Sequence, residues 1–341
     1  MRTPGVGAFL AGGAAATLWQ MRKIYPYTWI APIEVQRSPR ASGAGRDGHP
    51  SFRLLITNVL MENTQHHRLL RVIGDAVSPA DERPVDESPR QVLRRALEIF
   101  ETTGLSPVVG PELEYFLCEP DEDRPNGWRP YCDEPGNVYA TGRRGDSDGH
   151  LLRTLRTLSS AGLQTTGGNH EYAGGQFEIN LKHRADAVAA CDDALMLRRA
   201  IKAVAEAQGR MASFMAKPFV DQAGSGMHIH ASVLDRDGNN ILACTPDAPA
   251  DALRHAVAGL QATSRDCMLL FAPHANSYRR FVLNAFVPLN DCWGFNNRTV
   301  AMRIPHSDPA NTRIEHRIAG ADANPYLVTA AVLAGILHGL R

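Results

Sequence analysis

Alternating apolar and polar side chains predict β-strands at several points along the chain. In the stretch 108–117, Leu113 and Tyr115 alternate with acidic residues. Comparable short patterns occur at residues 175–181, around His228 and at 313–317. The apolar run 52–56 could form another strand, and Arg303 stands in a further short apolar segment.

Longer periodic patterns predict helices between these strands. Residues 88–104 predict a helix because Ser88 can cap it, Pro89 suits its first position and Gly104 can end it. Apolar patterns predict further helices over residues 186–208, near 253–267 and from Pro325 onward. Because strands and long helices do not alternate in regular β–α–β units, the sequence predicts an α+β fold.

The first 86 residues carry weaker signals. Glycine, proline, serine and arginine cluster at 37–48, which predicts a loop or linker. Residues 5–19 loosely resemble a signal peptide, but they are too rich in glycine and alanine for a good membrane span. We interpret them as irregular. The chain thus divides into an atypical N-terminal segment, residues 1–86, and a second region, residues 87–341.

The composition of the chain indicates a globular protein and gives no support for nucleic acid or a membrane as a binding partner. The chain is 44% hydrophobic and 21% charged, which is typical of a globular protein. Its formal net charge is zero, so neither nucleic acid nor a membrane surface is expected as a partner. Its six cysteines form no C-x-x-C pair and are expected to be reduced thiols in a cytoplasmic protein.

A glycine-rich segment directly precedes two histidines. In 223–230, a loop containing Gly224 and Gly226 leads into His228 and His230. In a strand, this spacing places both imidazoles on one face. Flexible backbone followed by two convergent nitrogen ligands indicates a site for a metal and an anionic group. By itself, a His-x-His pair can equally be incidental.

Acidic side chains interrupt other apolar strands in a way that indicates a metal site. Glu112 and Glu114 share one strand face, and Glu178 and Glu315 each stand beside an isoleucine. Buried carboxylates are costly unless they are paired or bind metal. Each alone could be a salt-bridged glutamate. Together with His228, an oxygen-rich ligand set suits Mg²⁺ or Mn²⁺ better than zinc.

Arginines are concentrated in the last quarter of the chain. They are Arg279, Arg280, Arg298, Arg303, Arg313 and Arg317. Arginines near acidic metal ligands indicate recognition of carboxylate and phosphate groups. Divalent metals with arginines are typical of phosphoryl transfer, in which catalysis depends on positioning and on neutralising charge.

Several motifs in the same order make the region from Ser88 onward resemble the catalytic domain of the glutamine synthetase superfamily. They are Gly110–Phe116, Asn169–Tyr172, Gly174–Glu178, Gly224–His230, Asn297–Thr299, Arg313–Arg317 and Asn324–Leu327. The resemblance implies a curved antiparallel sheet, a partial barrel, flanked by helices. It also implies a homo-oligomeric ring, a dodecamer of stacked hexamers.

The resemblance implies two metal sites and three kinds of ligand contact. One ion would be held by Glu114, Glu171 and Glu178, and the other by Glu112, His228 and Glu315. ATP contacts would come from His230, Ser232, Arg298, Arg303 and Arg313. Glutamate contacts would come from Gly224, Arg280 and Arg317. Arg298, nearest the transferred phosphate, and Glu171 would be catalytic.

The implied reaction has two steps. ATP phosphorylates the γ-carboxylate of glutamate, and an amine then displaces phosphate to form an amide. The chemistry is consistent, because a carboxylate is a poor electrophile and an acyl phosphate supplies a leaving group.

One position departs from glutamine synthetase and bears on the amine. Phe286 stands where those enzymes carry a loop glutamate that helps to bind ammonium. An aromatic wall suits an alkyl amine, although Phe286 could equally be a packing residue. Residues 293–298 also resemble the γ-glutamylpolyamine synthetase branch. We therefore expect a polyamine or alkyl monoamine as substrate. The alternatives are a glutamine synthetase that uses ammonium and a non-catalytic homologue that binds nucleotide or glutamate.

The ends of the chain also depart from the family. Relatives carry an N-terminal β-grasp domain, a pattern not found in residues 1–86, and they continue beyond the motif Asn324–Leu327 for longer than this chain does. The sequence therefore predicts a degenerate or missing β-grasp domain and a truncated C-terminus.

Overall fold

The computed structural model describes residues 53–63, 68–78, 81, 83–132, 138–283 and 285–341. Residues 5–19, expected to be irregular, and residues 37–48, expected to form a loop or linker, lie outside these described residues. The chain forms two compact units, residues 1–91 and 92–341. Their division falls within helix α3 (Pro89–Thr103), which begins and ends where the sequence predicts.

The first unit contains an antiparallel pair of strands, β1 (Arg53–Asn63) and β2 (Arg68–Val77). An irregularity between Ile56 and Asn58 shifts the register of the pair. The strand expected at 52–56 corresponds to the start of β1, except for residue 52, which is outside the described residues. The degenerate or missing β-grasp domain expected in the first 86 residues stays a prediction.

The second unit is built around a nine-stranded sheet. Its strands run in the order β5-β6-β3-β8-β11-β10-β9, and β4 and β7 also pair with β3. Their bounds are β3 (Ser106–Pro120), β4 (Trp128–Pro130), β5 (Thr165–His170), β6 (Gln176–Leu181), β7 (Met211–Ser213), β8 (Met227–Leu234), β9 (Trp293–Phe295), β10 (Met302–Ile304) and β11 (Ile314–His316).

The sheet is mixed and open. Each ladder between its described strands is antiparallel except that between β9 and β10, which is parallel. The sheet is therefore antiparallel, as expected, except at this edge. The pairing partner of a three-residue strand depends on the surrounding chain, and its own pattern does not specify it. The α+β class is confirmed.

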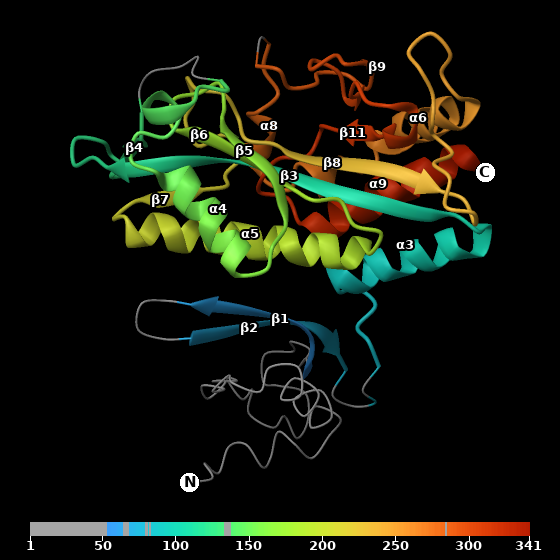
Figure 1. Cartoon of the computed structure of the whole chain (residues 1–341), viewed down its shortest axis with the longest axis horizontal. Helices are drawn as coiled ribbons and strands as arrows, with labels where there is room; N and C mark the ends of the chain where they lie inside the picture. Colours follow the sequence, from blue (N-terminus) through green and yellow to red (C-terminus); the bar gives the residue numbers. More distant parts are fainter. Residues whose placement is uncertain (1–52, 64–67, 79–80, 82, 133–137, 284) are drawn as a thin grey trace. The chain divides into compact units, whose positions relative to one another are not determined.

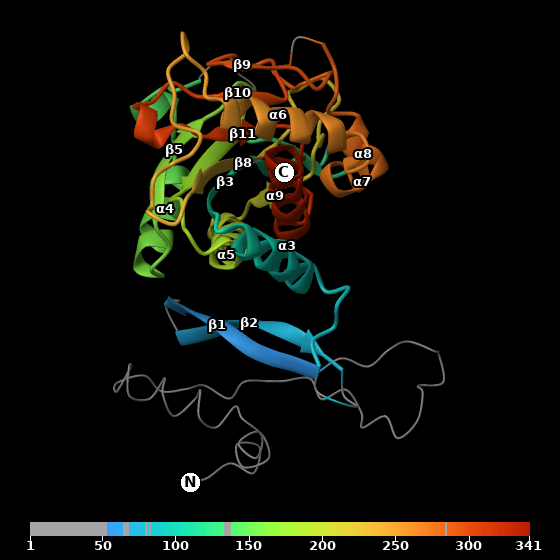
Figure 2. The same ribbon diagram turned by 90° about the vertical axis from the view of Figure 1, so that its right-hand side faces the viewer.

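Helices flank this sheet (Figures 1 and 2). The long helices α5 (Ala187–Ala207) and α9 (Pro325–Leu340) contact β3 and β8, respectively. Asp186 caps α5 by accepting a hydrogen bond from the N–H of Ala189, at 2.9 Å. The remaining helices are α4 (His150–Ser160), α6 (Asp251–Ser264), α7 (Met268–Phe271), α8 (Ala275–Tyr278) and the 3₁₀ turns Gly142–Arg144 and Pro309–Asn311.

The two faces of the central strands differ in chemistry. In β3, Leu113 and Tyr115 are fully buried, whereas Glu112 and Glu114 on the opposite face keep some exposure. In β8, Ile229 is likewise buried between two histidines. One face of the sheet thus packs into the core and the other carries the polar groups. No helix in the described part of the chain is long and apolar enough to cross a membrane.

Candidate active site

Strand register brings the acidic and imidazole side chains together on one face of the sheet. Glu112 of β3 stands opposite His228 of β8, and Glu114 stands opposite Glu178 of β6. Glu315 of β11 stands opposite His230. Directly opposed residues have neighbouring side chains. Four adjacent strands therefore assemble the site from segments far apart in the sequence.

Glu114, Glu171 and Glu178 form a group of three carboxylates whose ligand oxygens lie within 4.8 Å of one another. These are the side chains expected to hold one ion. Burial raises the pKa of Glu178 well above its usual value, and the carboxylates of Glu112 and Glu171 add to the rise. Burial also raises the pKa of Glu114 and of Glu171. Buried, mutually repelling carboxylates are the arrangement that a divalent cation neutralises.

Glu112 joins both histidines of β8. Its Oε1 is 2.5 Å from Nδ1 of His228, and its Oε2 is 3.1 Å from Nε2 of His230. Burial alone would raise the pKa of Glu112, but the two imidazoles hold it well below its usual value. The expectation that both histidines share one face agrees with this geometry.

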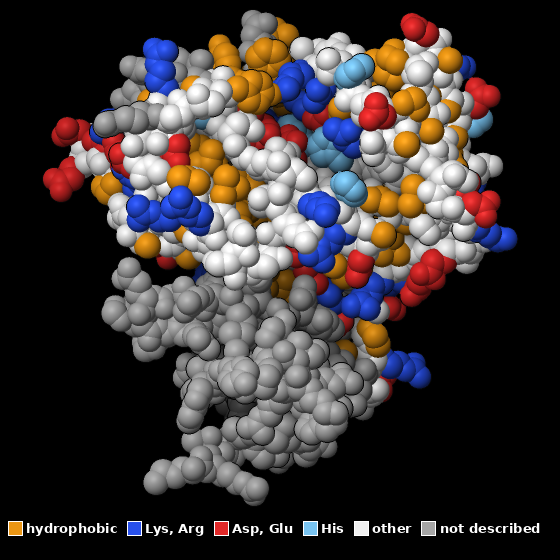
Figure 3. All heavy atoms as spheres, viewed as in Figure 1, with side chains coloured by type: hydrophobic (Ala, Val, Ile, Leu, Met, Phe, Trp, Pro, Cys, Tyr) orange, Lys and Arg blue, Asp and Glu red, His pale blue; other side chains and the backbone are white. Residues whose placement is uncertain are grey.

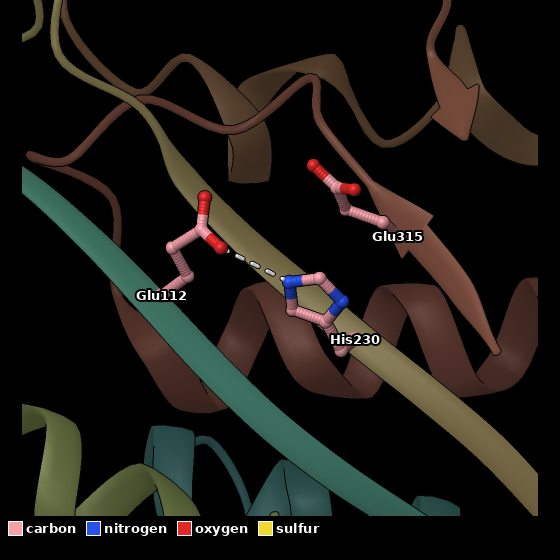
Figure 4. Close-up of side chains that lie close together, drawn as sticks. All are labelled: Glu112, His230 and Glu315. Carbon is pink, nitrogen blue, oxygen red and sulfur yellow. Dashed lines mark hydrogen bonds and ion pairs between the residues drawn. The ribbon is translucent and has the colours of Figure 1, made fainter. Parts of the chain in front are cut away.

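A second group of possible metal ligands contains Glu112, His230 and Glu315, which point toward one another from β3, β8 and β11 (Figure 4). A further group joins Glu112 and Glu178 to His228. Nδ1 of His228 is also 3.6 Å from Glu315. The sequence assigned His228 to the ion and His230 to the nucleotide, whereas the structure places both imidazoles within reach of the carboxylates.

Two arginines compensate the buried carboxylate of Glu315. Nη1 of Arg303 lies 2.8 Å from Glu315 Oε2, and Nη1 of Arg317 pairs with Oε1. Among the described residues, the buried Nε atoms of both arginines have no hydrogen-bond partner. An unpartnered buried guanidinium N–H is costly, so these groups suit an incoming anion.

The other expected ATP contacts lie in and around the same sheet. Arg313 donates from Nε to Nδ1 of His230, at 3.2 Å. Ser232 donates to the carbonyl oxygen of Thr312, at 3.0 Å, so its hydroxyl is already bonded to backbone.

Arg298, the expected catalytic arginine, is exposed and lies over the ring of Tyr139 at 5.6 Å. Burial would lower its pKa, but Tyr139 and the carboxylates of Glu171 and Glu315 raise it above its usual value. The positive charge of Arg298 is thus attracted toward the carboxylates of Glu171 and Glu315. Acidic, histidine and basic side chains gather on this face of the molecule (Figure 3).

Close packing explains the glycines before β8. A Cβ on Gly224 would lie 2.6 Å from Cγ of Arg280 and 2.7 Å from the carbonyl oxygen of Ala216. Gln176 donates to the carbonyl oxygen of Gly224, at 3.0 Å. Arg280 is buried, and its guanidinium donates to the carbonyl oxygens of Ile318, at 2.6 Å, and Arg317, at 3.0 Å. Of the three residues expected to hold glutamate, Arg280 therefore bonds to the backbone that follows β11 and packs against Gly224.

Phe286, the expected wall of the amine pocket, is half-exposed and has a positive φ of 50°. Its carbonyl oxygen accepts a hydrogen bond from Nη2 of Arg317, at 3.3 Å. Its ring makes an edge contact with Tyr172. This loop therefore borders the arginines that pair with Glu315.

Sequence reasoning did not assign Tyr172, Tyr139 or Gln176. Tyr172 and Gln176 lie within motifs quoted above, so the sequence placed them near the site, but it did not predict which residues they contact. Tyr139 has a φ of 57°, and its N–H donates to the carbonyl oxygen of His170, at 3.2 Å. The sequence around Tyr139 contains no pattern that predicts this long-range contact. Positive φ at a non-glycine residue is a feature that only coordinates reveal.

The residues present fit divalent metal ions and phosphate groups. Carboxylate oxygens with one or two imidazoles are ligands that Mg²⁺ and Mn²⁺ accept. Two guanidinium groups lie directly beside them, and their Nε atoms have no hydrogen-bond partner among the described residues.

Residues 86–341 match the family described as "Glutamine synthetase, catalytic domain". The chain is 44% identical over 268 residues to γ-glutamylputrescine synthetase of Escherichia coli (strain K12), covering 76% of this chain and 57% of that protein. It is 34% identical over 264 residues to glutamate–isopropylamine ligase of Pseudomonas sp., covering 76% and 57%.

Further similarities concern an ethanolamide enzyme and a solved structure. Identity to γ-glutamylethanolamide synthetase of Streptomyces coelicolor is 35% over 269 residues, covering 76% of this chain and 56% of that protein. The cryo-EM structure of Plasmodium falciparum glutamine synthetase superposes with a TM-score of 0.75 at 21% identity, covering 91% of this chain and 65% of that one, which supports the fold. The chain thus spans little more than half the length of these relatives.

Proposed function

The chain belongs to the family of the glutamine synthetase catalytic domain, and on that premise we propose that it carries the active site of an ATP-dependent glutamate–amine ligase. One observation carries the proposal. The glutamate and histidine side chains that could hold metal lie on one face of the sheet, together with Arg303 and Arg317, which pair with Glu315. Metal ligands beside guanidinium groups that still have an N–H to donate are what transfer of a phosphoryl group to a carboxylate requires.

The first step places ATP and the γ-carboxylate of glutamate over this face. Bound Mg²⁺ or Mn²⁺ would neutralise phosphate charge and would be held by the groups around Glu178 and Glu112. The Nε atoms of Arg303 and Arg317 have no partner among the described residues and can donate to phosphate or carboxylate oxygens. Arg298 is exposed and can move onto the transferred phosphoryl group, where charge develops.

The second step is attack of the amine on the acyl phosphate. The nitrogen forms a bond to the carbonyl carbon of the acyl phosphate, phosphate leaves from that carbon, and the amine loses a proton. Glu171 directly precedes Tyr172, whose ring contacts Phe286, so its carboxylate is proposed as the group that receives this proton. Phe286 in place of a loop glutamate removes a charged partner for ammonium, which supports an alkyl amine or polyamine as substrate.

Three points remain part of the proposal. We propose Mg²⁺ or Mn²⁺ as the ions, a homo-oligomeric ring as the assembly, and glutamate, ATP and an amine as the ligands. Similarity to enzymes named for putrescine, isopropylamine and ethanolamine supports an amine over ammonium. Glutamine synthetases are similar at lower identity, for example 32% over 280 residues for that of Clostridium saccharobutylicum, so use of ammonium is the second candidate.

Release of ADP and phosphate, measured with a panel of amines, tests the proposal. Release should require both glutamate and an amine, and putrescine, isopropylamine or ethanolamine should be better substrates than ammonium. Faster product formation with ammonium would favour glutamine synthetase. Binding of ATP with no release under any condition would favour a non-catalytic homologue.

A further inference from the structure

Two aromatic side chains contact each other beside the carboxylate groups. The ring centroids of Tyr172 and Phe286 are 6.2 Å apart, with an interplanar angle of 67°. Tyr172 is 50% exposed and Phe286 is 53% exposed. Each ring covers only part of the other in this edge-to-face contact, so apolar surface remains open to a ligand.

Hydrogen bonds from the backbone place each ring near a different carboxylate, Tyr172 near Glu171 and Phe286 near Glu315. Tyr172 directly follows Glu171, and its N–H donates to Glu171 Oε2, at 3.3 Å. The carbonyl oxygen of Phe286 accepts from Nη2 of Arg317, whose Nη1 pairs with Glu315. The aromatic pair therefore spans from the end of β5 to the end of β11, at the border of the charged face.

The backbone of Phe286 is strained in a way that favours a functional role. Its φ of 50° is unusual for a residue with a bulky side chain. Such conformations persist where surrounding contacts enforce them, and they cluster at ligand sites. The hydrogen bond from Arg317 to the carbonyl oxygen is one such contact.

We propose that Tyr172 is a specificity-determining residue that forms, with Phe286, an aromatic clamp for the hydrocarbon chain of the amine. The inference rests on the proposed ligase function. Methylene groups of a diamine would be removed from water against the rings, and its second ammonium group would be attracted to a ring face. Ammonium has no hydrocarbon to bury, so it gains little from the clamp.

Steady-state kinetics of Tyr172 variants test the clamp. Tyr172→Ala should raise the KM for putrescine about tenfold, equivalent to about 1.4 kcal/mol. The KM values for ATP and glutamate, and the rate with ammonium, should stay within about twofold, because these ligands do not use the ring. Tyr172→Phe should retain the KM for putrescine, since it keeps the ring.

A matched control and a double variant sharpen the test. Tyr278 is 46% exposed and makes a similar edge contact with Phe281, at 6.3 Å, so Tyr278→Ala controls for the loss of an exposed tyrosine. If the two rings act together, Tyr172→Ala combined with Phe286→Ala should raise the KM for putrescine by less than the product of the single effects.

Calorimetric binding of putrescine, measured in parallel, separates the two proposals. If putrescine binds the Tyr172→Ala variant more weakly than the unmodified chain while neither of them shows turnover, that result would support the clamp and contradict the ligase activity. Turnover of alkyl amines with an unchanged KM in Tyr172→Ala would overturn the clamp alone. Absence of both putrescine binding and amine-dependent turnover in the unmodified chain would overturn both.

Discussion

Glu112 and His228 face each other across β3 and β8, and Glu112 Oε1 lies 2.5 Å from His228 Nδ1. The second carboxylate oxygen reaches His230 on the same strand. Among the residues that the structure describes, Glu112 belongs to two of the three groups that could hold a metal. The carboxylate of Glu112 is therefore shared by the group with His230 and Glu315 and the group with Glu178 and His228.

Glu112→Gln should weaken metal binding and abolish most activity. The amide removes a charged ligand but keeps the size of the side chain, so we expect activity to fall at least about 100-fold. Titration calorimetry with Mn²⁺ would show the change independently of turnover. Glu119→Gln on the same strand is the matched control, because Glu119 pairs with Arg129 and belongs to no such group. Equal Mn²⁺ affinity in both variants would contradict the assignment.

Stabilisation by metal should increase with pH. The folded-state pKa values of Glu114, Glu171 and Glu178 are raised by burial, so their contribution to stability is present below the unfolded pKa and is lost as pH rises through the folded pKa. Bound cation would remove this loss by replacing the protons. The pKa of Glu112 is lowered, so that group titrates below this window and keeps the same charge across it.

Thermal unfolding with Mg²⁺ and with a chelator measures this effect. The difference in midpoint should grow as the pH rises above the usual pKa of a glutamate carboxyl. Glu178→Gln should reduce that growth, since it removes the carboxyl whose pKa is raised most strongly in the group. A midpoint difference independent of pH in the unmodified chain would rule out coupling between these carboxyls and the ion.

Gly224→Ala should destabilise the fold and impair the site. The new methyl group would meet Cγ of Arg280 and the carbonyl oxygen of Ala216, and backbone cannot move away cheaply. We expect the free energy of unfolding to fall by about 1–3 kcal/mol. Gly167→Ala in β5 is the control, because nothing lies within 4 Å of its added Cβ. Denaturant unfolding compares the two, and equal losses would show that packing under the loop is unimportant.

Arg298→Ala should lower kcat far more than it changes the KM for ATP. An exposed arginine attracted toward Glu171 and Glu315 contributes most when negative charge develops on the transferred phosphoryl group. We expect kcat to fall about 100- to 1000-fold. Arg254→Ala is the control, since Arg254 makes an exposed pair with Asp251, at 3.5 Å, and such pairs contribute little. An unchanged kcat in Arg298→Ala would exclude this role.

Local patterns were sufficient to predict the main elements. The helices α3, α5, α6 and α9 and the strands β3, β6, β8 and β11 lie where the sequence predicts them. Strand β5 was not predicted, because residues 165–170 contain no alternation of apolar side chains. Its position depends on pairing with β6, which places Glu171 beside Glu178.

The sequence by itself determined which side chains share a face, because side chains alternate along a strand with a period of two. It thus specified Glu112 with Glu114, and His228 with His230, opposite the buried face of the sheet. Only the tertiary structure decided that these pairs meet, since Glu112 and His228 are 116 positions apart. Register between such distant strands is set by packing of the whole core, and no local pattern contains it.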